Sequence, residues 1–436
     1  MEQLTVPEVT QSLFEQVSSL ESLQASFAEV KRNKGAPGID DVSLSAYSSN
    51  LDLELRQLQA ELVNWSYKPQ AVKRVEIPKP NGGTRSLGIP TVRDRVVQTS
   101  IKRAIEPLID NTFSANSYGF RPGRNQRQAV EAAQRIVVEE GKEYVVDIDL
   151  SKFFDRVNHD RLIASLRNHG IEKRILRLIG QLLRSGVSID GKIQPTHEGT
   201  PQGGPLSPLL SNIVLDELDK ELEKRQLSFC RFADDCNIFV RSRKAAERVM
   251  TSLCQFIERK LKLVVNREKS QVARTSEVKF LGLTIVNGTI AISRKAMSEA
   301  MQKVKELTKR GTYLTLEDSI KEINRWYVGW SNYFSMTQYP NQLYSIEAHI
   351  RRRLRARIVY QSKRRRHLYR KLLSRGIRQK VAAKTAFSNR KCWSLSWTWA
   401  MNRAFDNKWF AEVGLKTKSH NTLPHWFGEK KRVKLS

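Results

Sequence analysis

Two apolar runs with the composition of β-strands enclose a pair of adjacent acids, Asp234 and Asp235. The runs, Phe229–Phe232 and Cys236–Val240, predict a hairpin that carries both carboxylates at its tip. Carboxylates this close repel each other and gain nothing from core burial, so a divalent cation is the economical means of holding them. A solvated turn explains the dipeptide alone more simply, and the metal interpretation therefore requires a second acidic site.

That second site follows the apolar run Tyr144–Ile148, which has the composition of another strand. Asp149 ends this run, and the aromatic Phe154 follows five residues later. Nucleotidyl transfer uses carboxylates on neighbouring strands, because one metal ion lowers the pKa of the attacking 3′-hydroxyl and a second stabilises the leaving pyrophosphate. Asp147 shares its face of the strand with Asp149, so the spacing of the acids does not decide between them.

The chain is strongly basic, with 75 Lys and Arg against 45 Asp and Glu and a formal net charge of +30. A polyanion is the expected partner, although the charge alone also fits a ribosomal or membrane-surface protein. Residues 351–390 contain 16 Lys or Arg and no acid, which fits phosphate binding better than a solvated helix. The candidate nucleic-acid-binding residues are Arg351, Arg352, Arg353, Arg364, Arg365 and Arg366.

Tryptophans accompany the basic residues after 391, where they fit base stacking and core packing equally well. The four cysteines show neither zinc-ligand spacing nor a disulfide framework, which predicts a reducing compartment. No apolar run approaches the roughly 20 residues of a membrane span. We therefore expect a soluble protein of the bacterial cytoplasm or nucleoid with no membrane partner.

The order of predicted elements gives the fold class. Residues 1–70 have helical periodicity, and residues 71–290 alternate short strands with amphipathic helices. After about residue 295 the chain is helical and increasingly basic. This order predicts an α+β protein with a helical, basic C-terminal part.

Six short sequence blocks follow one another along the chain: Ile77–Arg85, Tyr118–Arg124, Asp149–Asp155, Gly199–Pro208, Phe232–Asp235 and Asn266–Ser270. Their order resembles that of group II intron reverse transcriptases. Lys34–Asp40 is similar to the N-terminal extension of non-LTR enzymes, and Gly329–Phe334 is similar to the maturase or thumb motif, so the resemblance covers nearly the whole chain.

The resemblance implies a role for each candidate site residue. Asp149, Asp234 and Asp235, with the backbone carbonyl of Leu150, would hold two Mg²⁺ ions, and Asp147 would be a bystander. Phe154 would exclude the 2′-hydroxyl of ribonucleotides, although it also fits a core position.

The remaining implied contacts are to the nucleotide. Lys79 and Arg85 would bind the triphosphate, and Gln202 would lie near the sugar and the template. Lys269 would protonate the leaving pyrophosphate, although an ordinary surface lysine is equally plausible at that position.

The implied fold is a right-hand polymerase, with fingers and a palm that contains an antiparallel sheet, then a helical thumb and a basic C-terminal domain. The expected bounds are an N-terminal extension at 1–70, fingers and palm at 71–290, a thumb at 291–372 and a DNA/RNA-binding domain at 373–436. Phe232 departs from the family's usual Tyr and lacks its hydroxyl, so the resemblance implies metal binding but not the family's primer handling and fidelity. The sequence lacks the signature of an endonuclease domain and most resembles the short, class C-like form.

The resemblance predicts an RNA-directed DNA polymerase that copies RNA into cDNA and also assists splicing and mobility of its intron. The expected partners are template RNA, intron RNA, a DNA primer or target and deoxynucleoside triphosphates. Two alternatives stay open: a maturase that acts mainly by binding RNA, and a free-standing enzyme recruited to DNA repair or phage defence. The sequence predicts neither the oligomeric state nor the priming mode.

Overall fold

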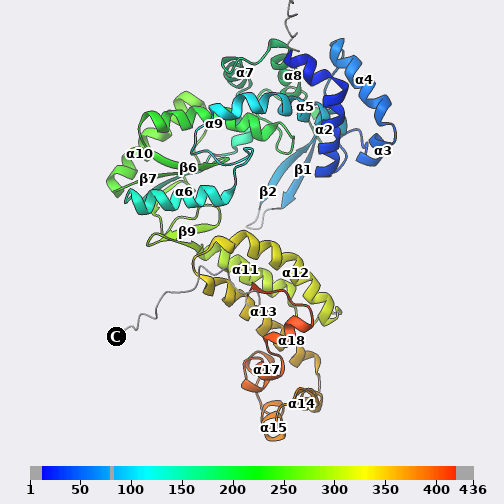
Figure 1. Cartoon of the computed structure of the whole chain (residues 1–436), viewed down its shortest axis with the longest axis vertical. Coiled ribbons are helices and arrows are strands. Elements are labelled where there is room, and N and C mark those ends of the chain that lie inside the picture. The colour runs from blue at the N-terminus through cyan, green and yellow to red at the C-terminus, as the bar shows by residue number, and fades with distance from the viewer. Residues whose placement is uncertain (1–11, 79–82, 419–436) are drawn as a thin grey trace, which may run out of the picture. The chain divides into compact units, whose positions relative to one another are not determined.

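The computed structural model describes residues 12–78 and 83–418, and the chain divides between Val278 and Lys279 into two compact units. Each unit has its own apolar core. Both are drawn in Figure 1, the first in blue to green and the second in yellow-green to red. The arrangement within each unit follows from its own strand pairs and helix contacts.

The first unit combines helices with two four-stranded sheets, as the α+β prediction requires. Its α-helices are α1 Leu13–Ser18, α2 Leu20–Asn33, α3 Leu44–Ser49, α4 Leu51–Val63, α5 Val92–Ile109, α6 Gln126–Glu139, α7 His159–Asn168, α8 Lys173–Leu183, α9 Ser207–Lys224 and α10 Arg243–Phe256. Short 3₁₀ turns lie at Asp110–Thr112 and Phe153–Arg156, and a π turn lies at Ile257–Leu261. Its strands are β1 Val72–Pro78, β2 Thr84–Ile89, β3 Tyr144–Ile148, β4 Val187–Ile189, β5 Lys192–Gln194, β6 Ser228–Phe232, β7 Asp235–Val240 and β8 Gln271–Arg274.

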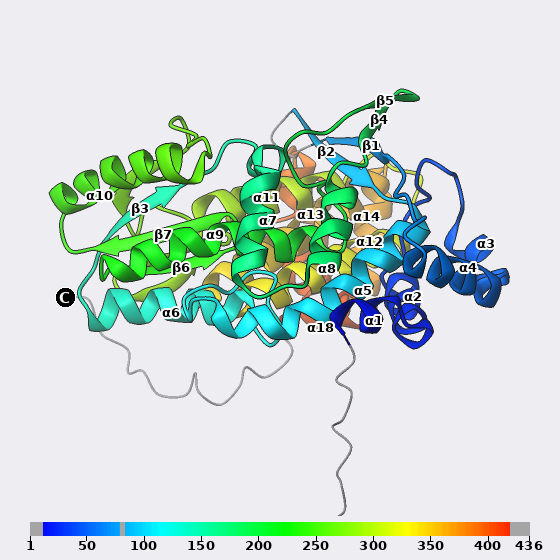
Figure 2. The same cartoon turned by 90° about the horizontal axis from the view of Figure 1, so that it is seen from above.

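The central sheet has the order β6-β7-β3-β8, and every neighbouring pair in it is antiparallel. Helices α6 and α9 contact β6, and α10 contacts β3, β7 and β8. Figure 2 shows β3, β6 and β7 side by side with α10 along them. The predicted strand at Tyr144–Ile148 is confirmed, and the predicted run 228–240 is confirmed as two strands around a turn.

Polar caps start two of the helices that contact this sheet, α6 and α10. The Asn125 side chain accepts from the Gln128 N–H and the Gln128 side chain accepts from the Asn125 N–H, which is a complete capping box at the start of α6. The Ser242 hydroxyl caps α10 in the same way, by accepting from the Ala245 N–H. Each cap satisfies backbone donors that have no partner within the helix.

The second sheet has the order β2-β1-β4-β5, in which β1 pairs antiparallel with β2 and parallel with β4. Pro78 lies opposite Thr84 at the end of the β1–β2 pairing. Lys79, a predicted triphosphate contact, lies outside the described residues.

The second unit is a hairpin followed by helices. Its elements are β9 Leu283–Val286, β10 Thr289–Ile292, α11 Arg294–Leu307, α12 Leu316–Tyr333, a 3₁₀ turn at Phe334–Met336, α13 Pro340–Gln361, α14 Arg365–Ser374, α15 Gln379–Ala386, α16 Cys392–Leu395, α17 Trp399–Ala404 and α18 Asn407–Glu412. Gln342 accepts from the Ile292 N–H and donates to the Ile292 carbonyl, which fixes β10 to the start of α13. The hairpin therefore belongs to this unit, although the expected limit between palm and thumb was residue 290. In the part of the chain that the structure describes, no helix is long and apolar enough to cross a membrane.

Helix α13 runs through the core of the second unit and carries buried arginines. The Arg355 guanidinium donates to the carbonyls of Ser396 and Phe405. Burial, together with the neighbouring cations Arg351 and Arg352, lowers the pKa of Arg355 to about 10. Arg357, 1% exposed, donates to the Ser319 hydroxyl and to the carbonyls of Leu314 and Thr315. Part of the basic segment is therefore internal structure.

We predict that Arg357→Ala lowers the free energy of unfolding by about 2–4 kcal/mol, because it leaves buried acceptors without their donor. Chemical denaturation measures this change. The control is Arg366→Ala, which removes an exposed arginine and should change stability by less than about 0.5 kcal/mol. Equal effects of the two substitutions would contradict the structural role of Arg357.

Candidate active site

The pairing of β3 with β7 brings the predicted acidic residues to one end of the central sheet. Ile148 lies opposite Cys236, so the next step in the same register places Asp149 beside Asp235. Phe232 and Asp235 close the β6–β7 hairpin around Ala233 and Asp234. The structure therefore places all three predicted carboxylates at the tip of this hairpin and the adjacent strand end.

These carboxylates are open to solvent to different degrees. Asp234 is exposed and Asp235 is partly buried, and the side chain of Asp149 is 43% exposed. The main chain of Asp149 is fixed on both sides, because its N–H donates to the Ser270 hydroxyl at 3.0 Å and its carbonyl accepts from the Asn266 N–H at 2.8 Å. The turn at 266–270 thus holds the backbone of Asp149 while its side chain faces solvent.

The same turn places Lys269 next to Asp149, with the ammonium 4.0 Å from a carboxylate oxygen. Sequence reasoning could not separate this lysine from an ordinary surface residue, and the structure brings it to the site. At 68% exposure the lysine can swing toward another anion at little cost.

Asp147 lies one pair further into the sheet, opposite Asn237 on β7 and Gln271 on β8. Its carboxylate accepts a hydrogen bond from the Gln271 amide at 3.2 Å. Cys236 follows Asp235 on β7, and burial raises the pKa of its thiol far above the usual range, so this side chain stays neutral. Asp147 therefore forms a hydrogen bond within the sheet, whereas Asp149 directly follows the last residue of β3.

The donor set at the strand ends fits a hard divalent cation. Carboxylate oxygens are the ligands that Mg²⁺ prefers, usually one or two with water and phosphate oxygens completing its shell. Within residues 12–78 and 83–418, no three His, Cys, Asp or Glu side chains are already gathered closely enough to hold a metal ion. Because the carboxylates stand at exposed or partly buried positions, side-chain rotation can bring them together.

Phe154 both joins the core and lines a cleft. The ring is 8% exposed and packs edge-on against Phe153, and the Phe154 carbonyl accepts from the Thr200 N–H at 2.7 Å. It also borders a cleft of about 470 Å³ with Lys152, Thr200 and other residues. This position fits both a core role for the ring and the exclusion of the 2′-hydroxyl of ribonucleotides.

Arg85 and Gln202, 117 residues apart, are in direct contact, with the Arg85 Nε donating to the Gln202 side-chain oxygen at 2.9 Å. The Gly88 N–H donates to the Gln202 carbonyl at 2.6 Å. Gly203 has a φ of +122°, and a Cβ there would lie 2.6 Å from the Gly88 carbonyl oxygen. Only glycine fits at this crossing, so the loop 199–206 docks against β2 and positions both predicted nucleotide contacts.

Sequence reasoning gave no role to Arg231, which is completely buried on β6. It forms an ion pair with Asp219 of α9 at 2.5 Å and donates to the Ala233 carbonyl at 2.9 Å. Burial raises the pKa of the Asp219 carboxyl, and the Arg231 guanidinium opposes that shift. The sequence feature that could have identified Arg231 is a charged residue at a core position of an apolar strand, with acidic residues on the preceding helix.

The candidate nucleic-acid contacts Arg351, Arg352 and Arg353 lie on α13, and the structure uses them internally. The Arg351 side chain is 9% exposed and lies 3.8 Å from the fully buried Glu347 carboxylate. Arg353 donates to Thr308, and Arg352 lies over the ring of Trp393 at 4.0 Å. Packing thus engages all three side chains within the second unit, and their contact with nucleic acid stays a prediction.

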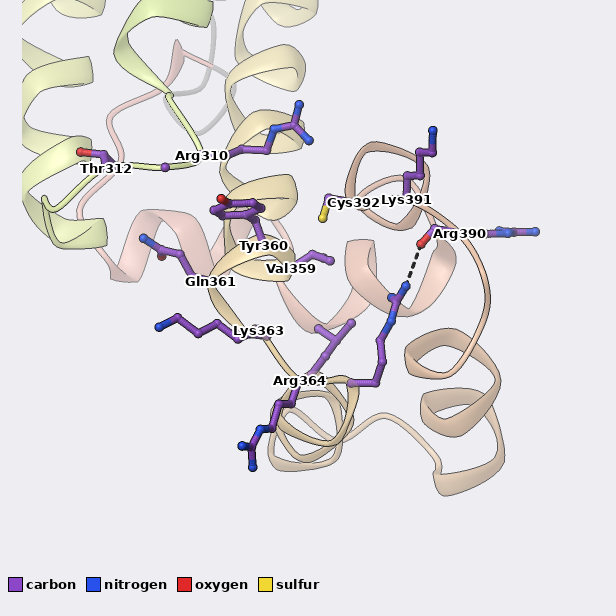
Figure 3. A pocket seen from close by; sticks show the side chains of 14 residues that line it. Arg310, Thr312, Val359, Tyr360, Gln361, Lys363, Arg364, Arg390, Lys391 and Cys392 are labelled. Atoms are coloured by element: carbon purple, nitrogen blue, oxygen red, sulfur yellow. Dashed lines mark hydrogen bonds between the residues drawn. The ribbon is translucent and has the colours of Figure 1, made fainter.

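Arg364, Arg365 and Arg366 are exposed, as their prediction requires. Arg364 and Arg365 line a cleft of about 950 Å³ in the second unit, where Arg365 donates to the Arg390 carbonyl at 3.1 Å. Figure 3 shows Lys363 and Arg364 across from the segment of Arg390, with that hydrogen bond dashed. The cationic lining residues are Arg310, Lys363, Arg364, Arg365, Arg390 and Lys391, and no acid is among the described residues that line the cleft.

The aromatic residues of the tail divide between core and surface. Trp409 packs edge-on against Phe405 and Phe410, which are core residues. Trp397 and Trp399 are 58% and 67% exposed. Trp426 lies outside the described residues. Trp409 therefore belongs to the core, whereas base stacking stays a prediction for the exposed Trp397 and Trp399.

Comparison with known proteins matches both units. Residues 77–285 match the reverse transcriptase (RNA-dependent DNA polymerase) family, and residues 297–375 match the group II intron maturase-specific domain. Protein YkfC of Escherichia coli (strain K12) is 33% identical over 284 residues, 56% of this chain and 74% of that protein. The group II intron-encoded protein LtrA of Lactococcus lactis subsp. cremoris is 27% identical over 391 residues, 73% of this chain and 64% of LtrA.

Solved structures are more distant. A telomerase from Candida albicans in complex with a fragment of telomeric RNA has a TM-score of 0.41 at 12% identity, with 77% of this chain and 67% of that chain covered. A partial Cas6-RT-Cas1–Cas2 complex has a TM-score of 0.38 at 24% identity, with coverages of 58% and 44%. The chain spans less than two thirds of LtrA and less than half of the Cas6-RT-Cas1 chain.

We predict that Gly119→Ala distorts the acidic hairpin. A Cβ at buried Gly119 would collide with the backbone nitrogen of Ala233, so the substitution should lower stability by about 1–3 kcal/mol through overpacking. Thermal unfolding measures the loss. Gly329→Ala is the control, because a Cβ there meets nothing within 4 Å and the change should raise helix stability by up to about 1 kcal/mol. An unchanged melting temperature for Gly119→Ala would refute the close packing.

Proposed function

Because the chain belongs to the reverse transcriptase (RNA-dependent DNA polymerase) family and carries a group II intron maturase-specific domain, we propose that it extends a DNA primer on an RNA template by two-metal nucleotidyl transfer. The observation that carries this proposal is the β3–β7 register, which sets Asp149 beside the Asp234–Asp235 hairpin. Asp149, Asp234 and Asp235 would hold two Mg²⁺ ions, with the Leu150 carbonyl as a further ligand.

Bound Mg²⁺ would supply positive charge that lowers the pKa of the attacking 3′-hydroxyl and stabilises the triphosphate and the leaving pyrophosphate. The protein's own contribution is to position the reactants. Arg85, fixed by its hydrogen bond to Gln202, would bind the triphosphate with Lys79. Lys269, 4.0 Å from Asp149, would deliver a proton to the leaving pyrophosphate oxygen.

The cationic cleft between α13 and α14 favours a second function for the same chain. RNA binding by the maturase-specific unit would neutralise the charges of the cleft, whose lining includes exposed Tyr360 as a stacking surface. We therefore propose that this unit binds template or intron RNA and assists splicing. A free-standing enzyme of DNA repair or phage defence would use the same polymerase site without an intron partner.

Primer extension on an RNA template tests the proposed function directly. The purified chain, a DNA primer annealed to RNA, Mg²⁺ and deoxynucleoside triphosphates should yield full-length cDNA, and chelation of the metal should stop synthesis. Absence of any extension by folded protein on RNA templates would contradict the proposal.

We predict that Asp149→Ala and Asp234→Ala each lower the rate of DNA synthesis by about a thousandfold or more, because metal positioning contributes several kcal/mol to the transition state. RNA binding should stay within a fewfold of wild type, since other residues neutralise the backbone. Asp147→Ala is the matched control on the same strand face and should retain most activity. If Asp147→Ala were inactive and Asp149→Ala active, the metal-binding role would belong to Asp147 and not to Asp149.

Phe154→Val should raise the incorporation of ribonucleotides relative to deoxyribonucleotides by about tenfold or more, because the smaller side chain opens space at the 2′ position. Single-nucleotide extension with competing dNTP and rNTP measures this ratio. Phe153→Val is the control, since Phe153 is buried beside Phe154 but is not part of the cleft lining. Unchanged discrimination in Phe154→Val would leave its ring with a core role only.

Neutralising Arg364, Arg365 and Arg366 to Gln should weaken RNA binding and reduce the slope of log affinity against log salt by about 2, because each lost phosphate contact removes roughly 0.7–0.9. Turnover at saturating template should change little. The same charge change at Arg243, Lys244 and Arg248, which are exposed on α10, is the control. Equal losses of affinity from both triple variants would mean that net charge alone, and not the cleft, binds RNA.

A further inference from the structure

The tip of the acidic hairpin is tied to the protein interior by a single buried arginine. Arg231 and Asp219 are both 0% exposed and form a two-pronged ion pair, with Arg231 Nε 2.7 Å and Nη2 2.5 Å from the two carboxylate oxygens. The remaining guanidinium nitrogen donates to the Asn212 side chain at 3.0 Å and to the Ala233 carbonyl at 2.9 Å. Arg231 thus joins helix α9 to the peptide that immediately precedes Asp234.

The segment 116–119 also bonds to Arg231 and to its partner Asn212. The Arg231 N–H donates to the Asn116 carbonyl, and the Arg231 carbonyl accepts from the Tyr118 N–H, both at 2.9 Å. The Asn212 amide in turn donates to the carbonyl of Gly119, the residue packed against Ala233. The network therefore connects the turn with α9 and the 116–119 segment.

The backbone of the turn needs such support. Ala233 has a φ of 57°, a left-handed conformation that residues with a Cβ adopt only at an energetic cost. The carbonyl of this residue is the acceptor that Arg231 holds. The bond fixes the orientation of the Ala233–Asp234 peptide and so the direction from which the Asp234 side chain leaves the backbone.

Stability alone gives a weak reason to keep an arginine at this position. Desolvation of two charges offsets most of their attraction, and apolar residues of similar size often serve a core equally well. A guanidinium, in contrast, can bond a carboxylate, an amide and a backbone carbonyl at once in fixed directions. A network with these three acceptors around an acidic turn therefore contributes more to the orientation of the turn than to the stability of the fold.

We propose that Arg231 is a positioning residue that, paired with Asp219 and bonded to the Ala233 carbonyl, orients the Asp234–Asp235 turn for divalent-cation binding. This inference rests on the proposed function, because it assigns those carboxylates to the metal ions. Arg231 itself touches neither metal nor substrate. Its effect should therefore be found in metal affinity and not in template affinity.

The test compares Arg231→Lys and Asp219→Asn with Asp94→Asn. A lysine keeps the charge but cannot bond the three acceptors together, and Asp219→Asn keeps the volume while removing the ion pair. Asp94 is the control, since it is another buried residue, 2% exposed, whose carboxylate accepts from the Tyr67 hydroxyl and from the Gln70 N–H. All variants of the full chain are compared below the onset of their thermal unfolding.

Two readouts separate positioning from folding. Electron paramagnetic resonance measures the Kd of Mn²⁺ without nucleic acid, and primer extension measures the Mg²⁺ concentration for half-maximal rate and the KM for template. Arg231→Lys and Asp219→Asn should raise both metal values at least fivefold with template KM unchanged. Asp94→Asn should lower the melting temperature and leave the metal values as in wild type.

Wild-type metal affinity in folded Arg231→Lys or folded Asp219→Asn would overturn the positioning role, and if only one of the two folds, that one decides. A loss of metal affinity in Asp94→Asn as large as theirs would also overturn it, because destabilisation would then explain the effect. Wild-type protein that neither binds Mn²⁺ nor extends a primer would instead contradict the proposed function. The two failures are thus distinguishable.

Discussion

The antiparallel register between β3 and β7 is the constraint on which the rest of the site depends. Because Ile148 pairs with Cys236, Asp149 reaches the end of the sheet beside the hairpin that carries Asp234 and Asp235. A slip by one residue would turn each strand's side chains to the opposite face. Helix α10, packed along β3, β7 and β8, buries the apolar face of these strands and so makes such a slip costly. The apolar residues thus fix the position of the acids, although they take no part in the chemistry.

The basic residues of the second unit serve two physical purposes. Arg355 and Arg357 satisfy backbone carbonyls inside the helical core, whereas the exposed arginines at the start of α14 border the cationic cleft. The internal group stabilises the unit, and the exposed group supplies the field that attracts a polyanion. A count of the basic residues in 351–390 does not distinguish the internal group from the exposed group. The helical face on which each arginine lies determines its function.

Sequence patterns predicted β3, β6 and β7 of the central sheet, because Tyr144–Ile148 and the two runs around Asp234 have few alternatives as buried β-structure, but they did not predict β8. They also located the acidic site, since a carboxylate at the end of an apolar strand is unusual. They could not rank Asp147 against Asp149 without the resemblance, because both share one face. They also missed Arg231, whose partner Asp219 lies on another element, and they could not show the burial of Arg351, which depends on how α13 packs. Pairings between separate elements are set by tertiary packing, which a local pattern does not contain.

Anomalous diffraction from crystals grown with Mn²⁺, a primer–template and a non-reactive nucleotide would identify the carboxylates that bind the metal ions. If the β3–β7 register defines the metal site, anomalous peaks should lie within coordination distance of Asp149 and of the Asp234–Asp235 turn, and none should lie at Asp147. Peaks coordinated by Asp147 or confined to other carboxylates of the chain would contradict this expectation, because the β3–β7 register would then not define the metal site.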